Sequence, residues 1–219
     1  MSKSGVADLA AVYVTATKKI AATSGSNEAT YYPDIRNLIA AILKERSLPF
    51  DVRVNTSESR GRGTDMPDFV LGDGGFVGVY GEVKLPEETL DAMARSTAQN
   101  DQIGRYLSAT GVVLLCNVRG FGLLAVKPGV RRERGTPIQP DDRELICSVD
   151  LWSAASGGAK PSVDQAAVVL LCETIDRAVT DYALLADPAD LAKVLARQAR
   201  DAKDAMPSDL RPISALLDD

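Results

Sequence analysis

The sequence predicts an α/β fold in which helices cover at least one face of a sheet. Apolar residues recur at helical spacing near the amino terminus, their period changes to two from Asp51, and strand and helix patterns alternate from there. The chain has 219 residues, enough for one domain with a buried core or for a domain with a small helical extension. Its 45% hydrophobic and 25% charged residues are typical of a globular protein.

Two helices are predicted before residue 50. The first spans about 5–22 and ends at the polar segment TSGSN, and its apolar positions are Val6, Leu9, Ala10, Tyr13, Val14 and Ile20. The second ends near Ser47 and carries the apolar positions Tyr31, Ile35, Leu38, Ile39, Ile42 and Leu43. Pro33 must lie in its first turn or kink it. Glu28 precedes this stripe by three and seven residues, so an early helix start would direct its carboxylate toward the core-facing side.

Three strands are predicted next. They are DVRVN from Asp51, PDFVL from Pro67 and FVGVYGEVK from Phe76, with the loop SESRGRGTDM between the first two. The second and third form a hairpin around Asp73-Gly74-Gly75. A three-residue turn would place Gly72 opposite Phe76 and Asp68 opposite Tyr80, with Glu82 a diagonal neighbour of Asp68. Val77, Val79 and Val83 would then point to the opposite, helix-covered face.

The rest of the chain predicts one helix over 86–109 and two strands, GVVLLCN and FGLLAV, around an Arg119-Gly120 turn. After residue 127 we expect a polar loop, a strand over ELICSVDLW, a flexible break at SGGAKPS, and helices over about 163–185 and 188–203. These signals divide the chain into a domain at 1–155 and a carboxy-terminal helical extension or linker at 160–219. No internal repeat is found in the sequence.

Composition excludes several chemistries. The chain contains no histidine, which rules out Ser-His-Asp and Cys-His hydrolases and two-histidine zinc sites. Its net charge of −5 gives no overall basic surface for DNA, so affinity for nucleic acid must come from a local patch or from attached domains. The three cysteines lie in apolar runs without ligand-like spacing, and no signal peptide or membrane span is apparent. We therefore expect a soluble, cytoplasmic protein with reduced, buried thiols.

Charged side chains gather on one face of the predicted hairpin. Asp68, Glu82 and Lys84 share that face, where polar groups gain nothing from core packing. Two neighbouring carboxylates repel each other unless a cation lies between them, and the hard, oxygen-seeking Mg²⁺ suits this place. A lysine beside the metal could orient a water or stabilise charge on a phosphate. The residues therefore fit metal-dependent phosphodiester hydrolysis, which needs no histidine.

These residues also carry a resemblance. Pro67-Asp68, thirteen intervening residues, and Glu82-Val83-Lys84 resemble the motif of the PD-(D/E)xK nuclease superfamily. The element order resembles its restriction-endonuclease-like α-β-β-β-α-β core, which implies a mixed sheet, here with an extra amino-terminal helix and carboxy-terminal helices. Gln102 and Tyr106 are similar to the QxxxY element of RecB-like and Type I restriction nucleases. Residues 26–126 resemble the amino-terminal nuclease domain of single-chain restriction-modification enzymes of the Type ISP and Type IIG kinds.

The resemblance implies a role for each residue. Asp68 and Glu82 would hold Mg²⁺, or Mn²⁺ in its place, with the carbonyl of Val83 as an extra ligand. Lys84 would position the attacking water, Gln102 and Tyr106 would orient the site or the DNA backbone, and Glu28 would assist directly or through water. The expected activity is DNA cleavage leaving a 5′-phosphate, in restriction-modification or phage defence. Expected partners are DNA, fused or associated methyltransferase, helicase or target-recognition regions, and a second copy for double-strand cleavage.

Other interpretations remain open. Asp68, Glu82 and Lys84 could form a surface salt-bridge ladder, and Glu28 could be a helix-start charge or capping partner. Arg60 and Arg62 could grip phosphate or belong to a solvated loop, and a similar choice holds for the charged segment 131–134. The domain could also be an inactive nuclease-fold module that binds DNA or a protein, or a stand-alone repair nuclease.

Overall fold

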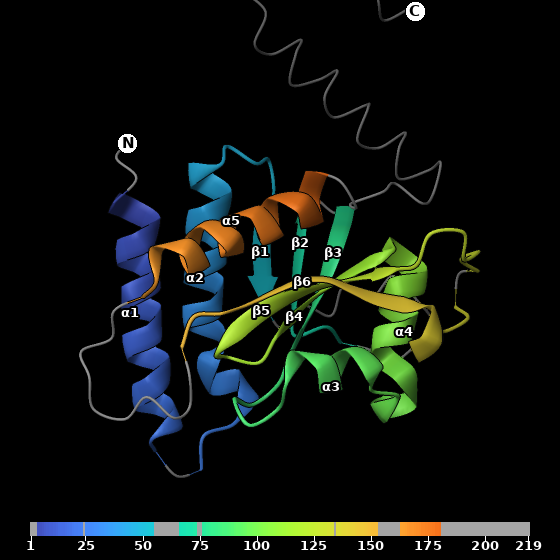
Figure 1. Cartoon of the computed structure of the whole chain (residues 1–219), viewed down its shortest axis with the longest axis horizontal. Coiled ribbons are helices and arrows are strands. Elements are labelled where there is room, and N and C mark those ends of the chain that lie inside the picture. The colour runs from blue at the N-terminus through green and yellow to red at the C-terminus, as the bar shows by residue number, and fades with distance from the viewer. Residues whose placement is uncertain are drawn as a thin grey trace, which may run out of the picture. The chain divides into compact units, whose positions relative to one another are not determined.

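The computed structural model describes residues 4–23, 25–54, 66–73, 76–133, 135–152 and 163–180 (Figure 1). They form a six-stranded sheet whose spatial order follows the chain, from β1 to β6. The strands are β1 (Asp51–Val54), β2 (Phe69–Asp73), β3 (Phe76–Val83), β4 (Val112–Cys116), β5 (Gly120–Val126) and β6 (Arg143–Asp150). Only β3 and β4 pair in parallel, and all other neighbours are antiparallel. The sheet is therefore mixed, and the predicted α/β class is confirmed.

Helices cover both faces of this sheet. On one side lie α1 (Ser4–Ala21), α2 (Tyr32–Glu45) and α5 (Gln165–Thr180), whose apolar residues share a core with Val79, Val83 and Leu114. On the other side lie α3 (Leu90–Arg95) and α4 (Ala98–Thr110), which pack against Tyr80 and Val113 (Figure 1). Each face is buried because both sides of the central strands β3 and β4 are apolar. Apart from the short α3 between β3 and α4, the order α2, β1, β2, β3, α4, β4 is the α-β-β-β-α-β order expected for the core.

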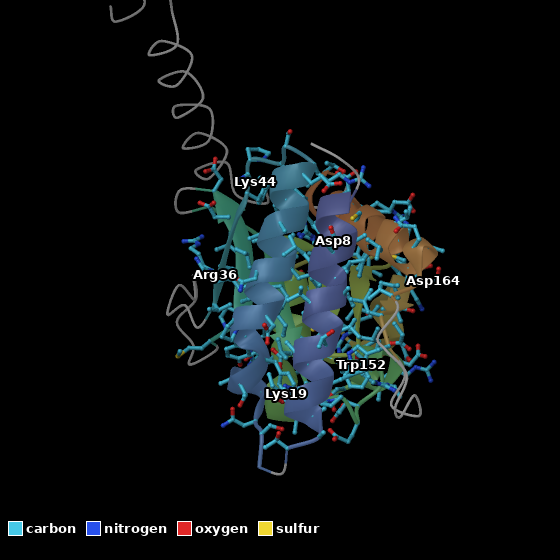
Figure 2. All side chains as sticks on the ribbon, turned by 90° about the vertical axis from the view of Figure 1, so that its left-hand side faces the viewer. Asp8, Lys19, Arg36, Lys44, Trp152 and Asp164 are labelled. Atoms are coloured by element: carbon cyan, nitrogen blue, oxygen red, sulfur yellow. The ribbon has the colours of Figure 1, made fainter. Side chains whose placement is uncertain are left out.

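The amino-terminal helices agree with the sequence prediction. α1 and α2 lie side by side, and the predicted stripe of α2 is buried along its length (Figures 1 and 2). Pro33 occupies the first turn of α2, where a missing N–H costs no hydrogen bond. A short 3₁₀ helix, η1 (Glu28–Tyr31), precedes α2 and is capped by Asn27 and Thr30 through a reciprocal capping box. Glu28 takes no part in that box.

The predicted register of the β2–β3 hairpin is wrong. The pairs are Phe69 with Gly81 and Asp73 with Phe76, and a bulge between Leu71 and Gly72 shifts the register within the hairpin. The predicted pairing of Asp68 with Tyr80 is therefore replaced by a register that sets Asp68 level with Glu82. The bulge also moves Val77 to the face covered by α3 and α4, whereas Val79 and Val83 stay on the opposite face.

The single helix predicted over 86–109 is also wrong. Residues 86–88 form a turn, Thr89 caps α3, and the chain leaves the helix at Ser96, whose ψ is 139°. The carbonyls of Ala94 and Ser96 accept hydrogen bonds from the guanidinium of Arg143, at 3.4 and 2.8 Å. This long-range partner satisfies carbonyls that a continuing helix would have used.

The carboxy-terminal half agrees in part. β4, β5 and β6 lie where strands are predicted, and α5 lies within the helix predicted over 163–185. Val168, Leu171 and Ile175 of α5 belong to the main core. The division of the chain into 1–155 and 160–219 stays a prediction. The helix predicted over 188–203, the break at 156–162, and Arg60 and Arg62 lie outside the described residues.

Two further expectations concern thiols and membranes. Cys116, Cys147 and Cys172 are free thiols, and Cys116 and Cys172 are buried. Burial raises the pKa of Cys116 to about 12, which makes its thiolate rare at neutral pH. Among the described residues, no helix combines the length and apolar character needed to cross a membrane.

Candidate active site

The β2–β3 hairpin sets two acids next to each other at one end of the sheet. Asp68 directly precedes β2, and Glu82 is the penultimate residue of β3. Because Phe69 pairs with Gly81, the residues just before and after them, Asp68 and Glu82, lie level across the hairpin. The parallel pairing of Glu82 with Leu115 places this end of β3 in the middle of the sheet. The acids therefore lie where β3 is paired with a strand on each side.

Asp68 is held by two donors from different elements. Its Oδ1 accepts a short hydrogen bond from the hydroxyl of Tyr32, at the start of α2. Its Oδ2 accepts the backbone N–H of Val83 at 2.7 Å. The carboxylate is therefore fixed on both oxygens before any ligand arrives.

Glu82 is buried, with 4% of its surface exposed. Its Oε1 accepts a hydrogen bond from Lys84 Nζ at 2.7 Å, whereas its Oε2 has no hydrogen-bond partner among the described residues. Burial, and then the nearby charge of Asp68, raise the pKa of Glu82 from 4.5 to about 7, although Lys84 opposes the shift. A buried carboxylate oxygen without a partner is costly, and a cation that it could bind would remove that cost.

Lys84 lies among oxygen atoms from three residues. Its ammonium is 2.7 Å from Glu82 Oε1, 3.0 Å from the carbonyl oxygen of Val83, and 3.5 Å from Glu28 Oε1. Burial lowers the pKa of Lys84, but the neighbouring acids outweigh burial and hold the pKa above its ordinary value. Lys84 is therefore a firmly charged ammonium at the centre of an acidic group of residues.

Glu28 reaches this group from η1. Its side chain is 36% exposed, and its ion pair with Lys84 connects the segment before α2 to the end of β3. The structure thus brings Glu28, Asp68, Glu82 and Lys84 together. This arrangement differs from a surface salt-bridge ladder on an exposed hairpin face, because Glu82 is buried and Asp68 is hydrogen-bonded to Tyr32 of α2.

Gln102 and Tyr106 lie one turn apart on α4 and are both buried. The side-chain amide of Gln102 donates to the hydroxyl of Tyr106 in a short hydrogen bond and to the carbonyl of Met66 at 3.2 Å. The ring of Tyr106 stacks on Tyr80, with centroids 4.7 Å apart. Gln102 therefore contacts the backbone just before Pro67-Asp68, not the carboxylates themselves.

The donor set fits a hard divalent cation. Asp68, Glu82 and the carbonyl of Val83 offer only oxygen atoms, and the partnerless Oε2 of Glu82 is a free lone-pair site within this set. In the part of the chain that the structure describes, no three Asp, Glu, Cys or His side chains form a cluster that could hold a metal. Mg²⁺ does not require one, because it is usually bound through one or two carboxylates while water and substrate oxygens complete its shell.

Tyr32 is a site residue that the sequence does not single out. A tyrosine next to Tyr31 at the start of a helix is expected to pack in the core or at its rim, and the body of Tyr32 is indeed buried at 7% exposure. Its hydroxyl is nevertheless the partner of Asp68, and burial together with Asp68 raises the pKa of Tyr32 far above its ordinary value. The only available signal is that a buried tyrosine hydroxyl needs a hydrogen-bond partner.

No protein-family model matches the chain, and no curated protein matches it. Two solved structures are similar at 15% identity. One is a complex of DrdV with DNA, with a TM-score of 0.44 over 79% of this chain, and the other is the type IIG restriction endonuclease BpuSI, with a TM-score of 0.47 over 73%. The chain spans 14% and 18% of the length of those two chains.

Proposed function

We propose that the chain is a metal-dependent DNA endonuclease domain of the PD-(D/E)xK type that acts in restriction-modification or phage defence. The observation that carries the proposal is the partnerless oxygen of the buried Glu82 beside Asp68 and Lys84. A buried acid, a second acid held by two donors and a charged lysine are what hydrolysis of a phosphodiester without histidine requires. Buried carboxylate oxygens without a partner are uncommon in folded proteins, and a bound cation would account for this one.

Asp68, Glu82 and the carbonyl of Val83 would hold Mg²⁺ or Mn²⁺. When bound, the metal supplies polarisation of a phosphodiester oxygen and stabilises negative charge on it. Asp68 stays oriented through Tyr32 and the N–H of Val83, so little ordering is needed at binding. Lys84 carries a permanent positive charge that can orient a water and stabilise charge on phosphate. Glu28 would keep the ammonium of Lys84 in place when Glu82 turns to the metal.

In this proposal Gln102 and Tyr106 are positioning residues and do not contact the metal or the substrate. Gln102 holds the carbonyl of Met66, and Tyr106 fixes Gln102 while stacking on Tyr80. Both therefore keep the segment that leads into Asp68 in position. An acidic chain needs help to hold DNA, so methyltransferase, helicase or target-recognition regions, fused or associated, and a second copy for double-strand cleavage complete the proposal.

Nicking of supercoiled plasmid by the full chain tests the activity. Asp68→Asn and Glu82→Gln should each abolish nicking in Mg²⁺ and in Mn²⁺, because each replaces a negatively charged metal ligand by a neutral amide of similar shape. Asp8→Asn, which changes an exposed acid of α1, is the matched control and should cut normally (Figure 2). Normal cutting by both site variants would reject the nuclease.

Calorimetric titration with Mn²⁺ separates the nuclease from an inactive module of the same fold. The active site should bind Mn²⁺, and Glu82→Gln should weaken this binding strongly. A wild-type chain that neither binds Mn²⁺ nor cuts would favour the module that only binds DNA or a protein.

A further inference from the structure

A groove of about 590 Å³ lies between α2, the turn that follows it, and β1. Two cationic side chains of α2, from Arg36 and Lys44, line it, and Asp51 and Arg53 of β1 form part of its opposite wall. Leu43 and Leu48 contribute apolar lining. Arg36 and Lys44 are exposed, so their charged groups are open to a ligand in solution (Figure 2).

The groove begins close to the candidate active site. Tyr32, which contacts Asp68, and Arg36 lie one turn apart on α2, a rise of about 6 Å. On the strand side, Arg53 pairs with Val70, two residues or about 7 Å along β2 from Asp68. From there the groove follows α2 toward Lys44. The helix that holds Asp68 through Tyr32 therefore also carries the two exposed cations, Arg36 and Lys44.

The charge of the groove opposes that of the whole chain. The net charge of the protein is −5, and the acids at the candidate active site repel a polyanion. A local excess of cations beside those acids would offset the repulsion where a negatively charged strand must approach. Flexible lysine and planar arginine groups over an apolar lining suit a phosphate backbone, whose sugars are less polar than its phosphates.

We propose that this groove binds the phosphate backbone of one DNA strand and leads it to the Asp68–Glu82–Lys84 site. The choice of DNA as the polyanion rests on the proposed nuclease function. Arg36 and Lys44 are eight residues apart on α2, about 12 Å, which corresponds to about three or four nucleotides of one strand. The contacts are to phosphates, so the groove contributes affinity and direction but reads no base sequence.

Binding of fluorescently labelled duplex DNA to the full chain, measured by anisotropy in EDTA, tests the groove without involving the metal. Arg36→Ala/Lys44→Ala should weaken binding roughly tenfold and lower the slope of log affinity against log salt by about two, between about 50 and 200 mM salt. Two duplexes of unrelated sequence should lose affinity equally. The matched control is Lys19→Ala/Arg95→Ala, which removes the same charge from exposed positions of α1 and α3 outside the groove and should bind normally.

The outcomes are distinct. Equal losses in both double variants would show a general charge effect and overturn the groove, as would unchanged binding in Arg36→Ala/Lys44→Ala. Displacement of DNA by poly-glutamate at the same charge concentration would overturn it in favour of an acidic protein partner. If Asp68→Asn cuts normally while the groove variant loses DNA, the nuclease assignment fails and the groove stands. If Asp68→Asn loses cutting while the groove variant binds DNA normally, the groove proposal fails and the nuclease assignment stands.

Discussion

The hydroxyl of Tyr32, at the first turn of α2, donates a hydrogen bond to Oδ1 of Asp68, 36 residues further along the chain. This contact joins the helix that covers the sheet to the acid at the start of β2. The second donor to Asp68 is the backbone N–H of Val83, which binds Oδ2. Orientation of the carboxylate thus depends on tertiary packing as well as on the hairpin.

Tyr32→Phe should weaken Mn²⁺ binding and slow plasmid nicking by about 10- to 100-fold, the usual effect of losing a partner that orients a metal ligand. Tyr31→Phe is the control, because Tyr31 is buried in the same helix start but its hydroxyl contacts only Ser26 among the bonds described, at 3.3 Å. Calorimetry and nicking rates measure the effect. Equal behaviour of the two variants would show that the Tyr32 hydroxyl has no special role.

Glu82 should make the metal-free protein less stable as pH rises. Its pKa is raised from 4.5 to about 7 in the folded state, so the folded chain holds the proton more tightly than the unfolded chain. The resulting stabilisation is full below about pH 4.5 and is lost as pH rises through about 7. Relative to Glu82→Gln, the wild type should lose on the order of 3 kcal/mol of unfolding free energy across this range.

Urea denaturation in EDTA at about pH 5 and about pH 8 measures that difference. Glu144→Gln, at an exposed position of β6, is the control and should track the wild type at both values. A constant gap between wild type and Glu82→Gln would contradict the prediction.

Gln102→Leu should remove the hydrogen bond to the carbonyl of Met66, because leucine fills a similar volume on α4 but has no donor. Loss of a buried hydrogen bond costs about 1–3 kcal/mol in unfolding free energy. Mn²⁺ affinity should fall as well, because the segment before Asp68 loses its anchor. Tyr106→Phe keeps the contact between Gln102 and Met66 and the stacking on Tyr80, so calorimetry should find its Mn²⁺ affinity closer to wild type. A Gln102→Leu protein that is less stable but binds Mn²⁺ normally would limit Gln102 to a structural role.

Gly81→Ala should destabilise the hairpin by roughly 1–3 kcal/mol. A Cβ at position 81 would overlap the ring of the buried Phe69, which pairs with Gly81 across the hairpin next to Asp68. Gly122→Ala on β5 is the comparison, since its Cβ would first meet the flexible end of Leu145 at 3.0 Å and should cost less. Thermal denaturation of both variants gives the ranking, and an equal or reversed ranking would contradict it.

Local periodicity was sufficient to predict most of the fold. The stripe of α2 and the apolar runs of β4 and β5 each have one consistent burial pattern, so their positions agree with the sequence. The hairpin register was not predictable in the same way. The register skips Gly78, a glycine of the kind that often marks a bulge, but a strand glycine alone does not fix where the register shifts or which residues then face each other.

Long-range partners explain the remaining differences. The break between α3 and α4 depends on Arg143, which lies 47 residues after Ser96. The contact of Tyr32 with Asp68 likewise joins residues that no local pattern connects. Asp68, Glu82 and Lys84 could be selected because their types and spacing bear on chemistry, whereas their supporting residues are defined only by packing.

The parallel seam between β3 and β4 has a consequence for how the chain folds. On each side of it, three consecutive antiparallel strands contact their sequence neighbours, and only the seam closes across the long segment that contains α3 and α4. Closing that segment carries the larger loop-entropy cost, so the two ribbons can form early while their joining waits. Glu82 lies on the seam. The pairing of Glu82 with Leu115, and with it the burial of Glu82 against β4, would then be completed only when the two ribbons join.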